Sequence, residues 1–185
     1  KMAIIDQQGN VLDYGAYYLT NSEKLRKEAQ KVLADKIRKF KVTLLSIGNG
    51  TASYETEQFA STMIEEEKLD CHYIITNEAG ASVYSASKLA IDELPDLDVT
   101  IRGAVSIARR VQDPLAESVK IDPKSIGVGQ YQHDVNQKQL THTLDQVVET
   151  VVNHVGVELN TASPAILQHI AGISSTVAKN IVAYR

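Results

Sequence analysis

Two short, unbroken apolar runs with one helix pattern between them constrain the fold more than any other feature. Val42–Ile47 reads VTLLSI and Cys71–Thr76 reads CHYIIT. Phe59, Met63 and Ile64 lie between them, spaced as on one face of a helix. Apolar runs that do not alternate with polar residues are typical of buried parallel strands. The strand–helix–strand order therefore predicts a parallel strand pair joined by a crossover helix.

A β-hairpin and an amphipathic helix are expected ahead of this unit. Met2–Asp6 and Val11–Leu19 are strand patterns on either side of a turn at Gly9, where glycine permits a positive φ. Thr20 precedes Glu23 at the spacing of a capping box, which marks a helix start. The helix that follows has one predicted apolar face, made of Leu25, Ala29, Val32, Leu33, Ile37 and Phe40.

The strand patterns stop near Val99, and only helix patterns follow. Before that point, one helix is expected over residues 81–94, and it ends before Pro95. The chain is therefore predicted to be an α/β domain over residues 1–112, a connecting segment over 113–137 and an all-α segment over 138–185. A long helix opens this last segment, and its predicted buried face consists of Leu140, Leu144, Val147, Val148, Val151 and Val155.

The composition is that of a globular protein and excludes several classes. Of 185 residues, 43% are hydrophobic and 23% are charged. The net charge of −4 argues against nucleic-acid binding by a positive charge spread over the whole surface. No run approaches the roughly 18 apolar residues of a membrane helix, and no secretory leader pattern is present. The single Cys71 cannot form an internal disulfide, which favours a cytoplasmic location. Lys1 opens directly on a strand pattern and Arg185 lies inside a helix pattern, so we expect a piece of a longer chain.

The last residues resemble a helix-hairpin-helix motif, which binds nucleic acid without sequence specificity. Ser163-Pro164 starts a short helix, Gly172 turns the chain and Ser174 caps the next helix. Such a turn leaves the first amide groups of the second helix free to bind a phosphate. The motif usually has a second glycine where Ser174 stands, and a packing unit without a ligand is an equally open interpretation. The residues expected to bind are Gly172, Ile173, Ser174, Ser175 and Lys179, with Arg185 adding charge.

A hairpin followed by alternating helices and strands also resembles the RNase H-like fold, whose nucleases hold metal ions between converging carboxylates. Glu78 follows the second apolar strand, where one such acid would lie. The strand expected to carry the first acid is not in the chain, and Arg102 stands where the last acid is expected. Asp113, a substitute for that last acid, lies about three helical turns further along the helix. Glu78 is therefore expected to be a carboxylate near a helix start rather than a catalytic group. The loop Gly48–Thr51 lacks the lysine of a P-loop and is expected to be a tight turn.

Several segments resemble the bacterial Tex family of transcription accessory proteins. They read NEAGASVYSAS, RGAVSIARR, QDPLAE, KIDPKSIGVGQYQHDV and, near the end, NTAS and NIVAYR. The resemblance implies that residues 1–112 are most of a YqgF-like domain with an RNase H fold, and that residues 138–185 are a connecting helix and a first helix-hairpin-helix motif. It also implies nucleic-acid binding linked to transcription and similarity to a eukaryotic elongation factor that handles histones. It does not imply nuclease activity. The family's C-terminal OB-type RNA-binding domain lies outside these residues.

The segment GVGQYQHDV contains His133 beside Asp134, which invites a metal or catalytic interpretation. No cysteine and histidine spacing matches a zinc site, and neither a metal nor a cofactor is expected. We predict instead that this loop packs the two modules together, with Tyr131 and His133 hydrogen-bonded between them. The candidates for phosphate contacts, or for a basic face between the modules, are Arg102, Arg109 and Arg110.

Three functions are consistent with these residues. The first is a non-catalytic scaffold that binds the backbone of single-stranded RNA or DNA. The second is a metal-dependent, RNase H-like nuclease or resolvase with Glu78 as a metal ligand. The third is a docking platform for the transcription machinery. None of the three involves a membrane.

Overall fold

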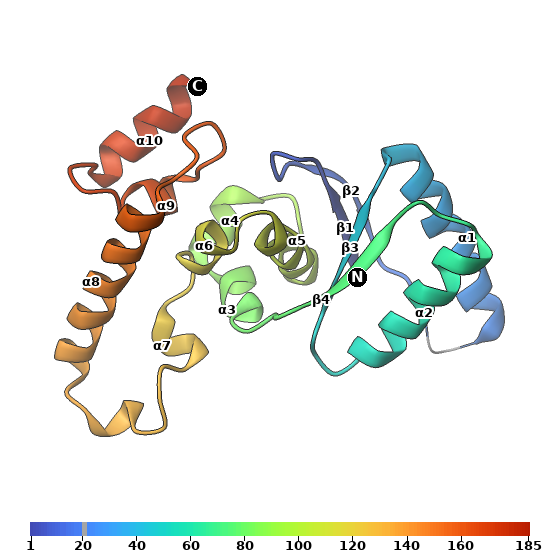
Figure 1. Cartoon of the computed structure of the whole chain (residues 1–185), viewed down its shortest axis with the longest axis horizontal. Helices are drawn as coiled ribbons and strands as arrows, with labels where there is room; N and C mark the ends of the chain where they lie inside the picture. The colour runs from blue at the N-terminus through green and yellow to red at the C-terminus, as the bar shows by residue number, and fades with distance from the viewer. Residues whose placement is uncertain (20–21) are drawn as a thin grey trace. The chain divides into compact units, whose positions relative to one another are not determined.

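The computed structural model describes residues 1–19 and 22–185, which form two compact units, Lys1–Gln112 and Asp113–Arg185 (Figure 1). Strands alternate with helices in the first unit, and the described residues of the second unit contain helices only. Within the part of the chain that the structure describes, no helix is long and apolar enough to cross a membrane. The order of elements follows the predicted change from α/β to helical structure.

The predicted β-hairpin is confirmed. β1 (Met2–Ile5) pairs antiparallel with β2 (Val11–Gly15), which ends earlier than predicted. Gly9 has a φ of +81°, a backbone conformation that glycine adopts without strain. The Asp6 carboxylate accepts a hydrogen bond of 2.8 Å from the Asn10 N–H, and this contact holds the turn closed.

The predicted parallel pair is confirmed as well. β3 (Leu44–Gly48) and β4 (His72–Thr76) run parallel, and α2 (Ser53–Glu66) connects them. Among the described residues, the two strand pairs form separate two-stranded sheets and not one continuous sheet. A strand in a two-stranded sheet has an open edge and less cover than a central strand. β4 is therefore more exposed than its apolar run predicts, at Tyr73, Ile74 and Ile75.

Helix α1 (Glu23–Phe40) packs with α2 around one hydrophobic core. The predicted capping residue Thr20 lies outside the described residues, and Ser22 is the observed N-cap, accepting a hydrogen bond from the Leu25 N–H at 3.1 Å. The predicted apolar face is partly wrong, because Leu25 and Val32 are exposed. The core of α1, α2 and the loop before β4 consists of Ala29, Ala34, Ile37, Phe59, Met63, Leu69 and Cys71.

The single helix predicted over residues 81–94 is two helices, α3 (Ala81–Ala86) and α4 (Lys88–Glu93). Ser87 separates them because its backbone is extended and its hydroxyl accepts a hydrogen bond from the Ala90 N–H, which starts a new helix. Helix α5 (Val99–Gln112) follows and contacts both strand pairs. Its buried residues pack on the hairpin, and its Ile107 carbonyl accepts a hydrogen bond of 3.2 Å from the Ser46 hydroxyl of β3.

The second unit begins with two short helices in the segment that was predicted to be a connection, residues 113–137. α6 (Pro114–Ser118) and α7 (Pro123–Ile126) each start with an aspartate cap, Asp113 or Asp122, followed by proline at the first helical position. A 3-10 turn, η1 (Gln132–Asp134), comes next. The repeated Asp-Pro pair was therefore the helix signal in this segment.

Helix α8 (Gln137–Val155) confirms the predicted long helix and only part of its predicted face, since Val148 packs against the core. Val152 is 0% exposed, whereas Val147, Val151 and Val155 are 52%, 41% and 66% exposed. Helices α9 (Pro164–Leu167) and α10 (Ser175–Tyr184) complete the unit. Their shared core with α8 consists of Val152, Ala162, Ile166, Leu167 and Ala178.

Candidate nucleic-acid interface

The turn between α9 and α10 has the geometry that the sequence predicted. Gly172 has a φ of +85°, which L-residues with side chains rarely adopt, and a Cβ atom there would meet no other atom within 4 Å. Ser174 is the N-cap of α10, and its hydroxyl accepts a hydrogen bond of 3.3 Å from the Val177 N–H. The glycine is therefore required by backbone conformation and not by lack of space.

Four exposed backbone N–H groups surround this turn. Those of Gly172, Ser174, Ser175 and Thr176 have no hydrogen-bond partner among residues 1–19 and 22–185. Unpaired N–H groups at a helix start, together with the helix dipole, favour an anion such as phosphate. Ile173 differs, because its N–H donates to the Ile170 carbonyl at 3.0 Å and its side chain packs against the core.

The cations predicted beside the turn are exposed. Lys179 lies on α10 with its side chain in solvent. Arg185 is exposed too, and its Nη1 atom donates a hydrogen bond of 2.6 Å to the Leu159 carbonyl. Lys179 therefore lies in the second turn of α10, whereas Arg185 lies at the far end of that helix from the hairpin turn.

Sequence reasoning missed Asn153, which contacts the turn from α8. Its Oδ1 atom accepts a hydrogen bond of 3.0 Å from the Ala171 N–H, and its Nδ2 atom donates to the His169 carbonyl at 2.8 Å. An asparagine in the valine-rich run VVNHV was the only available signal, since asparagine is a poor helix former.

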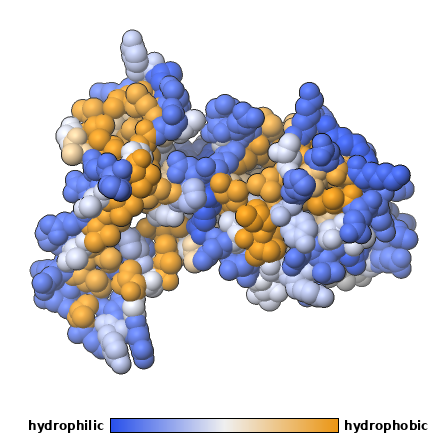
Figure 2. All heavy atoms as spheres, viewed as in Figure 1, coloured by the Kyte–Doolittle hydropathy of each residue, from blue (hydrophilic) through white to orange (hydrophobic). Residues whose placement is uncertain are grey.

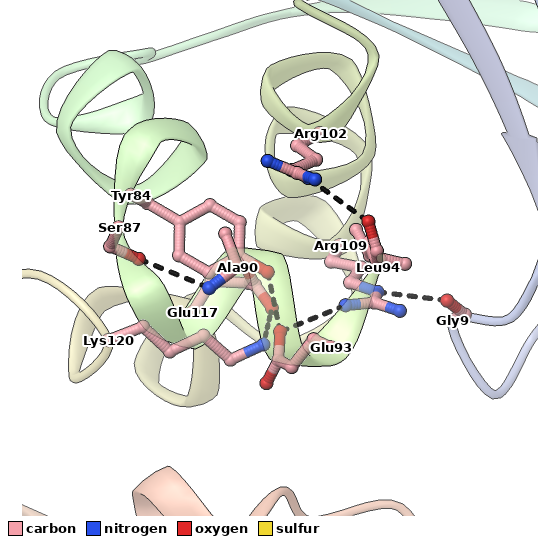
Figure 3. A network of polar contacts seen from close by, with 10 residues as sticks. All are labelled: Gly9, Tyr84, Ser87, Ala90, Glu93, Leu94, Arg102, Arg109, Glu117 and Lys120. Carbon is pink, nitrogen blue, oxygen red and sulfur yellow. Dashed lines mark hydrogen bonds and ion pairs between the residues drawn. The ribbon is translucent and has the colours of Figure 1, made fainter. Parts of the chain in front are cut away.

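The three arginines of α5 are engaged inside the first unit. Figure 3 shows Arg109 between the hairpin turn and α4, where its Nε atom donates to the Gly9 carbonyl at 2.9 Å. Its Nη1 atom lies 3.5 Å from a Glu93 carboxylate oxygen, and both side chains are 19% exposed. Arg102 donates from Nε to the Leu94 carbonyl at 3.0 Å (Figure 3). These contacts bind α5 to its neighbours, and a role in phosphate binding stays a prediction.

Arg110 forms hydrogen bonds with the backbone of the segment that follows β4. Its Nη1 atom donates to the carbonyls of Asn77 and Ala79, at 2.7 and 3.0 Å. Its Nε and Nη2 atoms are buried and have no hydrogen-bond partner in the described part of the chain. Arg110 thus holds this segment through backbone carbonyls, and its contact with a phosphate stays a prediction like those of Arg102 and Arg109.

Glu78 lies over the loop that precedes α2. Its backbone N–H donates to the Asn49 side-chain oxygen at 3.1 Å, and a Cβ atom at Gly48 or Gly50 would overlap its carboxylate. The two glycines thus make room for this side chain. Within the described residues, no group of three or more histidine, cysteine, aspartate or glutamate residues is arranged to hold a metal ion.

The loop that contains Tyr131 and His133 is held by other side chains within the second unit, and the predicted hydrogen bonds between the two modules stay a prediction. Tyr131 is 67% exposed, His133 is exposed, and neither side chain has a hydrogen bond in the described residues. Amide side chains hold the loop instead: Gln132 accepts from the Val128 N–H and donates to the Lys124 carbonyl, both at 2.9 Å. The polar groups that fix the loop were glutamines, which carry no distinctive sequence signal.

A mixed α/β unit followed by a helical unit with an open hairpin turn is the arrangement of an α/β domain joined to a helix-hairpin-helix motif. The family model described as Tex protein YqgF-like domain matches residues 1–112, and the helix-hairpin-helix motif model matches residues 152–185. The chain belongs to the Tex family.

Similar proteins are known from bacteria and from animals. The chain is 55% identical over 186 residues to protein tex of Bordetella pertussis and 54% identical over 186 residues to transcriptional accessory protein Tex of Neisseria gonorrhoeae. Each comparison covers 100% of the chain and 24% of the relative. The S1 RNA-binding domain-containing protein 1 of Homo sapiens is 49% identical over 188 residues, which is 100% of the chain and 19% of that protein. The chain thus spans about a quarter or less of the length of these relatives.

Proposed function

We propose that this chain is a non-catalytic nucleic-acid-binding scaffold of a transcription accessory protein, active in the cytoplasm. The carrying observation is the set of four exposed, unpaired backbone N–H groups at Gly172, Ser174, Ser175 and Thr176. Support also comes from the helix-hairpin-helix match over residues 152–185 and from the names of the relatives, which refer to transcription and to RNA binding.

The proposed contacts go to the phosphate backbone and do not read bases. Backbone amides recognise phosphate oxygens, which are the same at every nucleotide. Lys179 contributes one positive charge beside them. Single-stranded RNA or DNA is the proposed ligand, and the transcription machinery is the proposed setting.

The proposed RNase H-like fold of the first unit is a scaffold without nuclease activity. Two-metal cleavage needs several carboxylates around two ions. Glu78 lies at the expected strand end, but its carboxylate packs on the glycine loop at Gly48 and Gly50. Arg102, at the position expected for another acid, donates to a backbone carbonyl of the same unit.

The test measures binding of labelled single-stranded RNA and duplex DNA by fluorescence anisotropy at several salt concentrations, with and without Mg²⁺. We expect binding without Mg²⁺, weakening with salt by a log–log slope of about −0.7 per neutralised phosphate for single strands. The same samples, run on a denaturing gel, are expected to contain intact strands. Cleavage that requires Mg²⁺ and disappears in Glu78→Ala would replace this proposal with the nuclease function.

Gly172→Val tests whether the hairpin carries the binding. Valine is strained at a φ of +85°, so the turn must change and the amide groups must move. Gly129→Val is the matched control, because Gly129 is exposed, has no positive φ and has open space around a Cβ atom. We expect weaker binding only for Gly172→Val; equal affinities with intact folding would rule out the hairpin.

A second candidate function, protein docking, is favoured by α8. Val147, Val151 and Val155 form an exposed apolar row on this helix, and Figure 2 shows hydrophobic residues along it. Exposed apolar rows of this kind are typical of protein interaction sites. If the chain binds no nucleic acid but loses a transcription partner in Val151→Lys, docking is the correct function.

A further inference from the structure

We infer that Asn153 is a positioning residue that sets the hairpin turn for phosphate binding. This inference rests on the proposed function, because it assigns a role to a residue that would not itself touch nucleic acid. It begins from a side chain on α8 whose polar atoms are all directed at backbone groups. The Asn153 Nδ2 atom donates to the Glu149 carbonyl at 2.6 Å and to the His169 carbonyl at 2.8 Å, and Oδ1 accepts from the Ala171 N–H at 3.0 Å.

The contact with Glu149 fixes the direction of the side chain. Glu149 lies one helical turn before Asn153, so this hydrogen bond returns to the helix that carries the asparagine. The remaining Nδ2 hydrogen and the Oδ1 atom then face the hairpin turn. Val152, the preceding residue, is fully buried in the core of α8, α9 and α10, so the backbone that carries Asn153 is itself held in place.

Asn153 binds one backbone carbonyl and one backbone N–H group at the start of the turn after α9. His169 supplies a carbonyl and Ala171 supplies an N–H, two residues apart. Other N–H groups of the turn are paired within it, since Ile170 donates to Leu167 and Ile173 donates to Ile170, each at 3.0 Å. Of the paired N–H groups, that of Ala171 differs, because its partner is a side chain on another helix.

This arrangement divides the amide groups of the turn into two sets. The N–H of Ala171 is directed at α8 and satisfied there, whereas the N–H groups of Gly172, Ser174 and Ser175 have no partner in the described residues. Gly172 supplies the positive φ between the two sets. Asn153 therefore fixes the orientation of the peptide units that immediately precede the proposed phosphate-binding amides.

The experiment compares Asn153→Ala with Asn153→Asp in the whole 185-residue chain. Alanine removes both contacts with the turn. Aspartate keeps an oxygen that can accept from the Ala171 N–H but loses the donor to His169. Gln146→Ala is the matched control, because Gln146 is an exposed amide side chain on the same helix without a side-chain hydrogen bond in the described residues.

Two readouts separate positioning from a general loss of structure. Amide hydrogen exchange is expected to accelerate at Ala171 in Asn153→Ala, to stay slow there in Asn153→Asp, and to stay slow along α10 in both variants. The affinity of Asn153→Ala for labelled single-stranded RNA is expected to fall about five- to tenfold, the usual effect of losing one or two hydrogen bonds. Its salt slope is expected to match the wild-type slope, because the affected amides are neutral and release no counterions. Lys179→Ala is expected to reduce the slope by about one instead.

The outcomes distinguish this inference from the proposed function. A wild-type chain that does not bind RNA would overturn the proposed function and the positioning role together. A wild-type chain that binds, with an Asn153→Ala variant that binds equally well, would overturn only the positioning role. Unchanged exchange at Ala171 in Asn153→Ala would overturn it too, since the hydrogen bond would then not hold the turn.

Discussion

The register of α8 makes a quantitative prediction with two adjacent valines. Val152 is 0% exposed and lies in the core with Ile166 and Leu167, whereas Val151 is 41% exposed. Val152→Ala removes two buried methyl groups, whose transfer to water costs about 1.6 kcal/mol. The cavity left behind raises the expected loss to roughly 2–3 kcal/mol in the free energy of unfolding.

Val151→Ala is the matched control on the same helix. It removes the same two methyl groups from a partly exposed site, and alanine has the higher helix propensity by about 0.5 kcal/mol. The two effects oppose each other, so the expected change is within about 0.5 kcal/mol of zero. The same chemical substitution thus has different consequences at neighbouring positions.

The assay is thermal denaturation followed by circular dichroism. For a chain of this size, about 1 kcal/mol corresponds to a change of roughly 2–4 °C in Tm. Val152→Ala is expected to lower Tm by about 4–12 °C, and Val151→Ala to leave it almost unchanged. Equal effects of the two substitutions, or a larger effect at Val151, would refute the register and with it the core of the second unit.

Three further substitutions or conditions test the first unit. The hydrogen bond with Lys36 lowers the pKa of Asp13. The ion pair therefore stabilises the fold above the unfolded-state pKa near 3.8, and this stability is lost as the pH falls through the lower folded-state pKa. Asp13→Asn should flatten the acid end of the stability–pH curve. Burial raises the pKa of the Cys71 thiol, so its reaction with iodoacetamide at neutral pH should be slow in the folded chain and fast in urea. Rapid alkylation of the folded chain would contradict the burial of Cys71. Lys41 ends α1 with a φ of +53°, a left-handed conformation that is strained for lysine and not for glycine. Lys41→Gly should therefore stabilise the chain by about 1 kcal/mol in urea denaturation. A loss of stability would contradict that conformation.

The sequence predicted those parts of the fold that depend on local patterns. The hairpin at Gly9 and the parallel pair β3 and β4 follow from short-range turn chemistry and apolar runs, and both are present. The turn at Gly172 was predictable for the same reason, since a glycine between two short helix patterns permits the positive φ that such a turn uses. These features need only a few neighbouring residues to be specified.

The parts that could not be predicted depend on tertiary contacts. In α8, valines on two sides of the helix make two apolar stripes, and only packing against α9 and α10 decides that Val152 is the buried one. Asn153 belongs to the same category, because its partners lie 16 and 18 positions further along the chain. The α5 arginines were predicted as phosphate contacts or as a basic face between the modules, and the sequence alone did not indicate that Arg109 and Arg110 donate to backbone carbonyls.

The two strand pairs of the first unit have a shared dependence on α5. A two-stranded sheet is marginally stable alone, and α5 contacts both pairs through the hairpin core and the Ser46 hydrogen bond. We therefore expect a local opening of α5 to expose the hairpin and one side of the parallel pair together, while α2 still packs on the parallel pair. Amide hydrogen exchange that accelerates together in β1, β2 and the α5-facing side of β3 is the expected sign of this coupling.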